Sequence, residues 1–239
     1  MTRFPRRHVW RWLIGGVVAL AIVVVGGIWL YIHVIEGPAP APLSLQSAPA
    51  TTPAASSSAP APSSGAVTGT WHVAAGSVVG YRVNEVLAGQ HNVAVGRTSV
   101  ISGTVTIRGA STTAASFTVQ MATIKSDQSE RDAQFNGRIM DTAAYPTGAL
   151  TLTSPIALGK LPADGVIRTY GATGNLTLHG HTRPVTFSLQ AERTSASIEV
   201  SGSIPVVFAD WDIPNPSFAG FVTTQNHGLL EFLIKFSKS

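Results

Sequence analysis

From Trp71 onward, apolar and polar residues alternate with a period of two, and this pattern restricts the possible folds more than any other feature of the sequence. The alternating runs are short and are separated by turn-forming stretches such as residues 108–111 and 162–165. Successive side chains of a strand point to opposite faces of a sheet, so the pattern predicts antiparallel strands with one apolar and one polar face. About eight such strands suit a closed barrel, which has no exposed edge. We therefore predict an all-β, antiparallel barrel over residues 70–239.

The apolar positions of these runs are expected to face the inside of the barrel. An outer-membrane barrel would instead turn its apolar face toward lipid, and such a protein would not also carry the long apolar segment described below. A barrel of about eight strands can be filled by its own side chains or can leave room for one ligand. The candidate wall residues are Tyr81, Val83, Val105, Ile107, Phe117, Val119, Met121, Phe135, Ile139, Leu150, Leu152, Leu176, Leu178, Phe187, Leu189, Phe232 and Ile234.

Residues 124–155 interrupt the strands with a predicted short helix. Ser126 and Asp127 are residue types that cap helix N-termini. Apolar residues then recur at helical spacing, at Phe135, Ile139 and Met140. The helix is expected to end before Pro146, because the residue before a proline is disfavoured in helical conformation. A single helix of this kind can lie across the open end of a barrel.

Polar side chains on or beside this helix are candidates for contact with a ligand head group. Arg131 and Asp132 could serve that purpose, or they could support the helix by bonding its end and the neighbouring loop. Asn136 and Arg138 are further candidates for the mouth of the barrel. The sequence leaves both roles open.

The same stretch carries a resemblance to a known family. Its motifs are Arg-Asp at 131–132, Phe135, Met-Asp at 140–141, Tyr-Pro at 145–146 and Leu-Thr-Ser at 152–154, followed by GNLTLHG at 174–180 and TRPVTF at 182–187. On these residues the chain resembles the YceI-like family from roughly Thr70 to the C-terminus. The resemblance implies a lipocalin-like barrel that binds a polyisoprenoid, such as an isoprenoid quinone or a polyprenyl lipid, with no cofactor.

Two segments depart from the pattern of that family. Residues 96–98 are Gly-Arg-Thr, where many relatives carry an aromatic residue after the glycine. Residues 207–221 lack the arginine that relatives place ahead of an aspartate-aromatic-glycine motif. Two prolines exclude a regular central strand there, so we predict a loop. Its Phe218 and Phe221 could cover the barrel mouth, touch a membrane or pack inward.

The N-terminal part of the chain is predicted to be an anchor and a tether. Residues 1–12 are basic, residues 13–35 are apolar and long enough to cross a bilayer core of about 30 Å, and residues 36–69 are mostly Pro, Ala, Ser and Thr. Arginines before the apolar segment predict a cytoplasmic N-terminus, which places the barrel on the extracytoplasmic side of the cell membrane. Residues 36–69 are predicted to be a disordered linker, because they contain too few apolar residues to offset the entropy of ordering.

A cleaved signal peptide is the alternative to a single-pass membrane helix. The apolar region of a signal peptide usually has about 7–15 residues and ends at a small-x-small site. The apolar run here is longer, and its best candidate site, at residues 39–41, has proline in the middle.

Charge and motif content argue against several other functions. The net charge of +4 comes from four arginines in residues 1–12, so it does not indicate binding to nucleic acid. The chain has no cysteine, no nucleophile elbow and no phosphate-binding glycine motif. His179 and His181 could bring two imidazoles to one face, but no third ligand lies at a typical distance in the sequence. We predict no metal site and no enzymatic activity.

Two functions remain at this stage. The first is a membrane-anchored extracytoplasmic protein that holds an isoprenoid chain in its barrel. The second is a non-catalytic structural or adhesion module of the cell envelope, presented on a stalk. The first function requires a hollow barrel, and the second does not.

Overall fold

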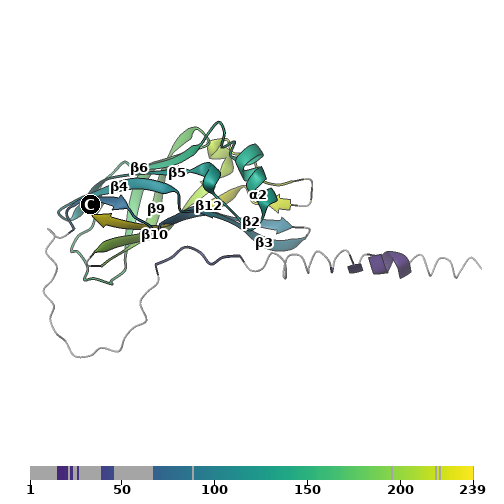
Figure 1. Cartoon of the computed structure of the whole chain (residues 1–239), viewed down its shortest axis with the longest axis horizontal. Helices are drawn as coiled ribbons and strands as arrows, with labels where there is room; N and C mark the ends of the chain where they lie inside the picture. The colour runs from purple at the N-terminus through teal and green to yellow at the C-terminus, as the bar shows by residue number, and fades with distance from the viewer. Residues whose placement is uncertain are drawn as a thin grey trace, which may run out of the picture.

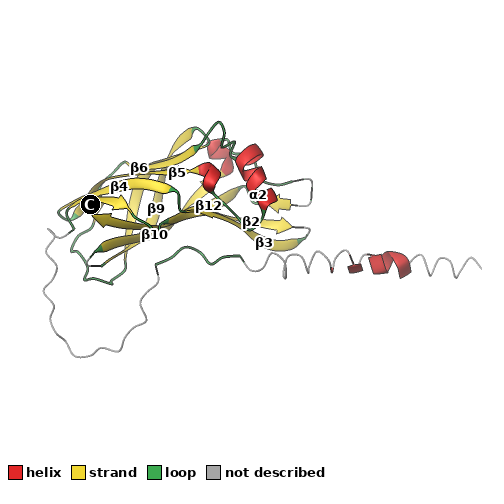
Figure 2. Ribbon diagram, viewed as in Figure 1, coloured by secondary structure: helices red, strands yellow, loops and turns green. Residues whose placement is uncertain are grey.

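The computed structural model describes residues 15–20, 22–23, 26, 39–45, 67–87, 89–194, 196–218, 220 and 222–238. From residue 67 onward these residues form a β-barrel with short helices gathered at one end (Figures 1 and 2). The strands are β1 (Gly69–Val73), β2 (Val78–Leu87), β3 (Gln90–Thr98), β4 (Ile101–Arg108), β5 (Ser111–Gln120), β6 (Thr147–Leu152), β7 (Ile156–Ala157), β8 (Arg168–Leu178), β9 (His181–Arg193), β10 (Ser197–Val207), β11 (Val222–Thr224) and β12 (His227–Lys238). The helical elements are the single turn η3 (Met121–Thr123), the α-helix α2 (Ser129–Gln134), the π-helical turn η4 (Phe135–Ile139) and the 3₁₀ turn η5 (Phe208–Trp211).

Eight of these strands close into a ring in the part of the chain that the structure describes. Their order is β1-β4-β5-β6-β8-β9-β10-β12, and β12 pairs again with β1. All pairings are antiparallel. β12 also pairs with β2, so β1 and β2 act as two halves of one bent strand, interrupted at residues 74–77. The predicted all-β barrel with one short helix across its end is confirmed.

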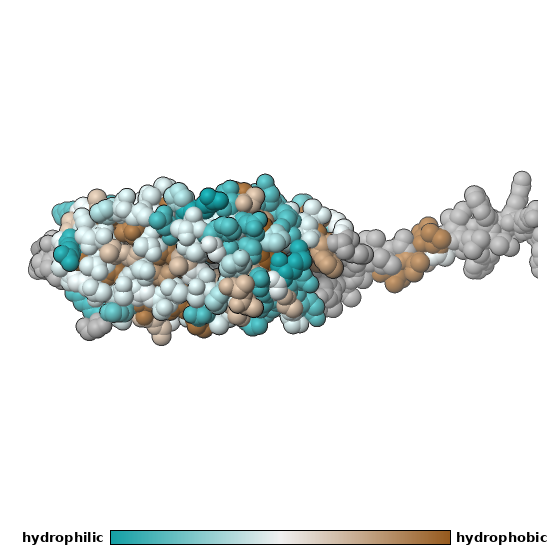
Figure 3. Space-filling model, turned by 90° about the horizontal axis from the view of Figure 1, so that it is seen from above, coloured by the Kyte–Doolittle hydropathy of each residue, from teal (hydrophilic) through white to brown (hydrophobic). Residues whose placement is uncertain are grey.

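The apolar and polar positions that alternate in the sequence lie on the inner and outer faces of the barrel, respectively. In β12, for example, Phe232, Ile234 and Phe236 are buried, whereas Lys235 and Ser237 lie toward the outer surface. The barrel face seen in Figure 3 is mostly hydrophilic or intermediate, with scattered hydrophobic residues. This arrangement is polar outside and apolar inside, as predicted.

Two glycines allow β2 and β3 to approach closely near the helical end. A Cβ atom on Gly80 would lie 1.9 Å from the carbonyl oxygen of Gly96, and a Cβ on Gly96 would lie 2.3 Å from Cε1 of Tyr81. The missing side chain at Gly96 therefore leaves room for the Tyr81 ring. That ring stacks on Phe135 of η4, with ring centroids 5.1 Å apart.

The structure describes only part of the N-terminal segment that was predicted to span a membrane. Most of the predicted span, residues 13–35, lies outside the described residues, and those described within it (15–20, 22, 23 and 26) are helical. Among the described residues, no helix has the length and apolar content needed to cross a membrane. The span therefore stays a prediction.

The predicted disorder of residues 36–69 is wrong for the two described pieces of that segment. Residues 39–45 pack on the barrel, and Leu45 is only 8% exposed. Val67 is buried, and its carbonyl accepts a hydrogen bond of 2.9 Å from Nε1 of Trp71. Both pieces are ordered by contacts with the barrel, which the local composition does not reveal. Residues 46–66 lie outside the described residues.

The close approach of β2 and β3 can be tested with Gly80→Ala. Because the new Cβ would meet backbone rather than a flexible side chain, we expect the free energy of unfolding to fall by about 1–3 kcal/mol. Gly171→Ala in β8 is the matched control, because nothing lies within 4 Å of its Cβ position. Urea denaturation followed by circular dichroism measures both, and equal stability of the two variants would contradict the prediction.

Candidate ligand-binding cavity

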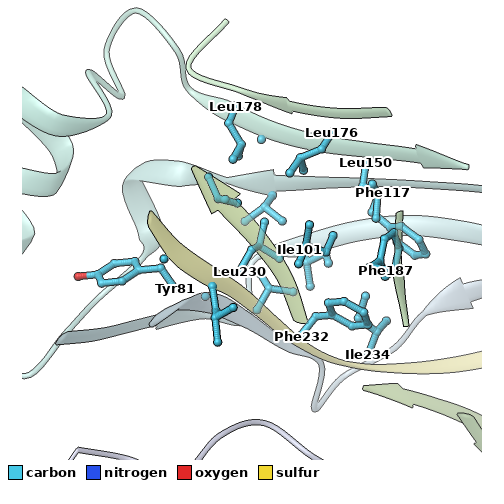
Figure 4. A pocket seen from close by; sticks show the side chains of 18 of the residues that line it. Tyr81, Ile101, Phe117, Leu150, Leu176, Leu178, Phe187, Leu230, Phe232 and Ile234 are labelled. Atoms are coloured by element: carbon cyan, nitrogen blue, oxygen red, sulfur yellow. The ribbon is translucent and has the colours of Figure 1, made fainter. Parts of the chain in front are cut away.

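The barrel encloses a cavity of about 760 Å³. Its wall is apolar over most of its area, because alternate residues of every strand face inward. Figure 4 shows Leu150, Leu176 and Phe117 on one side of this space and Phe232 and Ile234 on the other. The interior is therefore hollow, which the sequence had left open.

All of the wall residues expected from the sequence, from Tyr81 to Ile234, line this cavity. Several of them, including Val105, Leu150 and Leu189, are only half-buried although they face inward, because they border the empty space. Small residues such as Ala115 and Gly174 also form part of the wall and leave room beside the larger side chains. That these residues contact a ligand stays a prediction.

One end of the cavity, which we call the mouth, is bordered by α2, by η4 and by residues 213–218 and 222. Polar and charged side chains reach the cavity there, namely Glu85, Gln128, Glu130, Arg131, Gln134, Arg138 and Thr224. At the opposite end, Arg193 holds the loop of residues 158–167. Its Nε donates to the Pro162 carbonyl at 3.0 Å, and its guanidinium pairs with Asp164 at 2.7 Å.

Arg131 lies at the mouth with its charge already compensated. Its guanidinium pairs with Asp127 and, at 3.3 Å, with Glu85. Glu85 is held in turn by Asn92, whose side-chain amide donates to it at 2.9 Å. Glu85 was not among the predicted site residues, although it continues the inward alternation of Tyr81 and Val83. The mouth can therefore offer hydrogen-bond donors to a head group without a net positive charge.

Asp132 does not line the cavity and instead supports the segment that enters the helix. Its carboxylate accepts hydrogen bonds from the backbone N–H of Ser126 at 2.8 Å and from the Ser126 hydroxyl at 2.9 Å, and it pairs with Lys125 at 3.5 Å. The predicted capping by Ser126 and Asp127 is wrong, because the N-cap of α2 is Gln128 and has no side-chain cap. Instead, the carboxylate of Asp132 bonds to Ser126, which precedes the helix.

The other polar candidates also have structural partners. Asn136 accepts a hydrogen bond of 3.2 Å from the Thr142 hydroxyl and does not line the cavity. Arg138 borders the mouth and donates to the carbonyls of Asn215 and Pro216 at 3.2 and 3.1 Å. It therefore fastens η4 to the loop that follows η5.

The described residues after Val207, namely 208–218 and 220, form the predicted loop and contain the 3₁₀ turn η5. β10 ends at Val207, and Trp211 in η5 is buried and donates its Nε1–H to the Leu176 carbonyl at 3.2 Å. Phe218 is 55% exposed and borders the mouth. Phe221 lies outside the described residues.

The two histidines considered as metal ligands lie at the turn between β8 and β9. The His179 ring packs against Tyr145 with centroids 4.5 Å apart, and its Nδ1 lies 3.3 Å from the Trp211 carbonyl oxygen. His181 is the first residue of β9. In the described ranges of the chain, no group of three or more His, Asp or Glu side chains is arranged to hold a metal.

Burial changes the acid-base behaviour of Tyr81. Desolvation raises the pKa of its hydroxyl well above the usual value of 10.0; Arg131 lowers this pKa, while Asp132, Glu85 and Asp127 raise it. Figure 4 shows this hydroxyl directed away from the apolar residues deeper in the cavity. Tyr81 is thus a neutral donor near the mouth at physiological pH.

The fold and the cavity define a class of protein: an antiparallel barrel with a hollow apolar interior and a polar mouth, suited to bind a small apolar ligand. Residues 71–236 match the family model of the YceI-like domain. The chain belongs to the YceI-like family.

Two solved structures share this fold. A polyisoprenoid binding domain from Saccharophagus degradans implicated in plant cell wall breakdown has a TM-score of 0.58 and 15% sequence identity, and the match covers 71% of this chain and 98% of that one. BcnA from Burkholderia cenocepacia has a TM-score of 0.51 and 20% identity, with 65% and 95% of the two chains covered. No curated protein matches the chain.

The pKa of Tyr81 predicts a loss of stability in alkaline solution. The neutral hydroxyl contributes stability that is fully present below pH 10.0, the usual pKa, and is lost as the pH rises above it, because only the unfolded state ionises readily there. Tyr81→Phe should therefore reduce the decline of the free energy of unfolding above pH 10.0. Denaturation curves at several alkaline pH values measure the free energy of unfolding of both proteins. An identical decline in both would contradict the raised pKa of Tyr81.

Proposed function

We propose that this chain binds the isoprenoid tail of a lipid in its barrel and keeps the head group at the mouth. The observation that carries the proposal is the hollow apolar interior of about 760 Å³. This volume falls within the range of about 300–1,000 Å³ typical of small-molecule sites. Membership of the YceI-like family supports the ligand class, as does the shared fold with a domain that binds polyisoprenoids.

Burial of the tail supplies the affinity. Each buried methylene contributes about 0.8 kcal/mol, so an isoprene unit of five carbons contributes roughly 3–4 kcal/mol before ordering costs are subtracted. A few units are enough for tight binding. The wall offers contacts by shape alone, so the cavity selects for length and branching of the tail.

The mouth is suited to an uncharged or weakly charged head group. Arg131 is paired with two carboxylates, and Tyr81 remains a neutral donor. An isoprenoid quinone presents carbonyl oxygens that accept such hydrogen bonds. A polyprenyl phosphate would have to compete with Glu85 and Asp127 for the same guanidinium.

The location of the protein belongs to the proposal. The apolar length of residues 13–35 and the arginines before them support an anchor in the cytoplasmic membrane, with the barrel on its outer side. An anchor keeps a carrier of apolar ligands beside the bilayer in which those ligands reside. An adhesion module would have no use for a hollow interior, and a lipid-modifying enzyme would need a nucleophile and a base, a pair for which the sequence has no recognised motif.

The test is the lipid content of the purified full-length protein and of an Ala115→Trp variant. Ala115 lines the cavity from β5, so an indole there would occupy space that the tail needs. We expect organic extraction and mass spectrometry to recover an isoprenoid lipid from the native protein, and at least about tenfold less from the variant, which corresponds to about 1.4 kcal/mol.

Ala114→Trp is the matched control. Ala114 is the preceding residue of β5 and is exposed on the outer face, so its substitution should leave the lipid content unchanged. Native protein without bound lipid, or equal loss in both variants while both remain folded, would overturn the proposal.

A further inference from the structure

Residues 39–45 form an extended segment, called the strap below, on the outer face of the barrel. At one end of the strap, the backbone N–H of Leu45 donates to the Ser201 hydroxyl at 3.2 Å. Closer to the other end, Arg82 donates to the Pro40 carbonyl at 2.6 Å and Arg97 donates to the Ala41 carbonyl. In Figure 1 the strap is the purple segment that runs along the barrel.

The barrel has a built site for the strap. Arg82 and Arg97 lie 2.7 and 3.7 Å from Glu231, which is only 4% exposed although it is on the outward face of β12. Val95 also faces outward and is only 6% exposed. Proline-rich chains leave their carbonyls free of internal hydrogen bonds, so the two guanidinium groups can donate to the strap while they neutralise Glu231.

The direction of the strap brings the N-terminal part of the chain to the mouth. Leu45 is bonded at the level of Ser201, midway along β10, whereas Ala39 lies in a surface pocket with Asn92, Ser126 and Asp127. Ser126 and Asp127 immediately precede α2, which borders the mouth. Ala39, the N-terminal end of the strap, therefore lies at the mouth end of the barrel.

This geometry limits how far the barrel can stand from the predicted membrane span. Three residues lie between Ile35, the last residue of that span, and Ala39, so the Cα atoms of Ile35 and Ala39 can be no more than about 15 Å apart. With a free linker of 36–69, either end of the barrel could have faced the bilayer. With the strap docked, the mouth is the end held nearest to it.

The mouth also carries an exposed aromatic side chain on a well-supported loop. Phe218 is 55% exposed, and its backbone bonds to Val222 in both directions. Asn215 stabilises the same loop, since its side-chain oxygen accepts from the Ser217 N–H at 2.8 Å and from the Thr224 hydroxyl at 3.0 Å. Aromatic rings are favoured at the interface between membrane and water.

The charged side chains near the mouth give this end of the barrel no strong net charge. The basic groups near the mouth are Lys125, Arg131 and Arg138, and the acidic groups are Glu85, Asp127, Glu130 and Asp132. These groups nearly balance, so docking would depend on the tether and on apolar contact.

We propose that the mouth of the barrel docks on the surface of the bilayer, held there by the strap and by insertion of Phe218. The ligand then passes between the bilayer and the cavity without crossing water. The proposal rests on the predicted span at residues 13–35, and its second part rests on the proposed function.

The orientation can be measured with single fluorescent labels, because the chain has no natural cysteine. Glu130→Cys places a label on α2 at the mouth, and Lys160→Cys places one in the loop at the opposite end. The full chain is inserted in phosphatidylcholine vesicles that contain a spin-labelled lipid quencher. We expect strong quenching at position 130 and little at position 160. Equal or reversed quenching, or a requirement for anionic lipid, would overturn the proposal.

Two variants separate the contributions of strap and loop. Leu45→Asp should release the strap and abolish the difference in quenching, whereas Ser44→Asp, which adds the same charge at the exposed neighbouring position, should keep it. Phe218→Ser should slow transfer of bound lipid to acceptor vesicles by about tenfold, and Val166→Ser, an exposed apolar residue at the opposite end, should not. A Leu45→Asp variant that retains the quenching difference would contradict the role of the strap. The quenching assay needs no ligand, so docking and ligand binding can fail independently.

Discussion

The pairing of β12 with both β1 and β2 is the interaction on which the rest of the structure depends. It joins the two ends of the domain and converts a sheet with two open edges into a ring. In an open sheet, the apolar faces of the strands would have to be covered by another layer or exposed to water. In the closed ring they face one another, and a sheltered space results. Tyr81 and Phe232 reach opposite parts of that space from neighbouring strands of this closure.

The cavity stays hollow because its wall combines large and small residues and because hydrogen bonds hold the elements around its mouth in place. Ala115 and Gly174 are small residues of the wall that leave room beside the larger side chains. Asp132 and Arg138 hold the helical elements and the neighbouring loop in place by bonding backbone groups. The ion pairs of Arg131 are satisfied within the protein. The chemistry that remains available to a ligand is an apolar interior with hydrogen-bond donors at its entrance, and the proposed binding of a lipid depends on this combination.

The strap shows how a segment with an unfavourable composition becomes ordered. The composition of the Pro- and Ala-rich stretch at 36–69 predicts disorder, because the stretch contains too few apolar residues to offset the entropy of ordering. Leu43 and Leu45 are its only leucines, and they were the one local hint of a docking segment. The partners that order the strap are Arg82, Arg97 and Glu231, which come from three different strands. Their meeting on one outer face depends on the register of β2 with β3 and with β12, and no local pattern in the sequence specifies it.

The sequence by itself determined the class of fold, the strands, the face of each strand that turns inward and therefore the wall of the cavity. These properties follow from a period of two, which is a local signal that survives without knowledge of distant contacts. Only the tertiary structure decided that the interior is hollow, that Glu85 and Asp127 share Arg131, and that the strap leads to the mouth. Each of these depends on distances between residues far apart in the chain, and on volumes left unfilled, which alternation of polarity cannot encode.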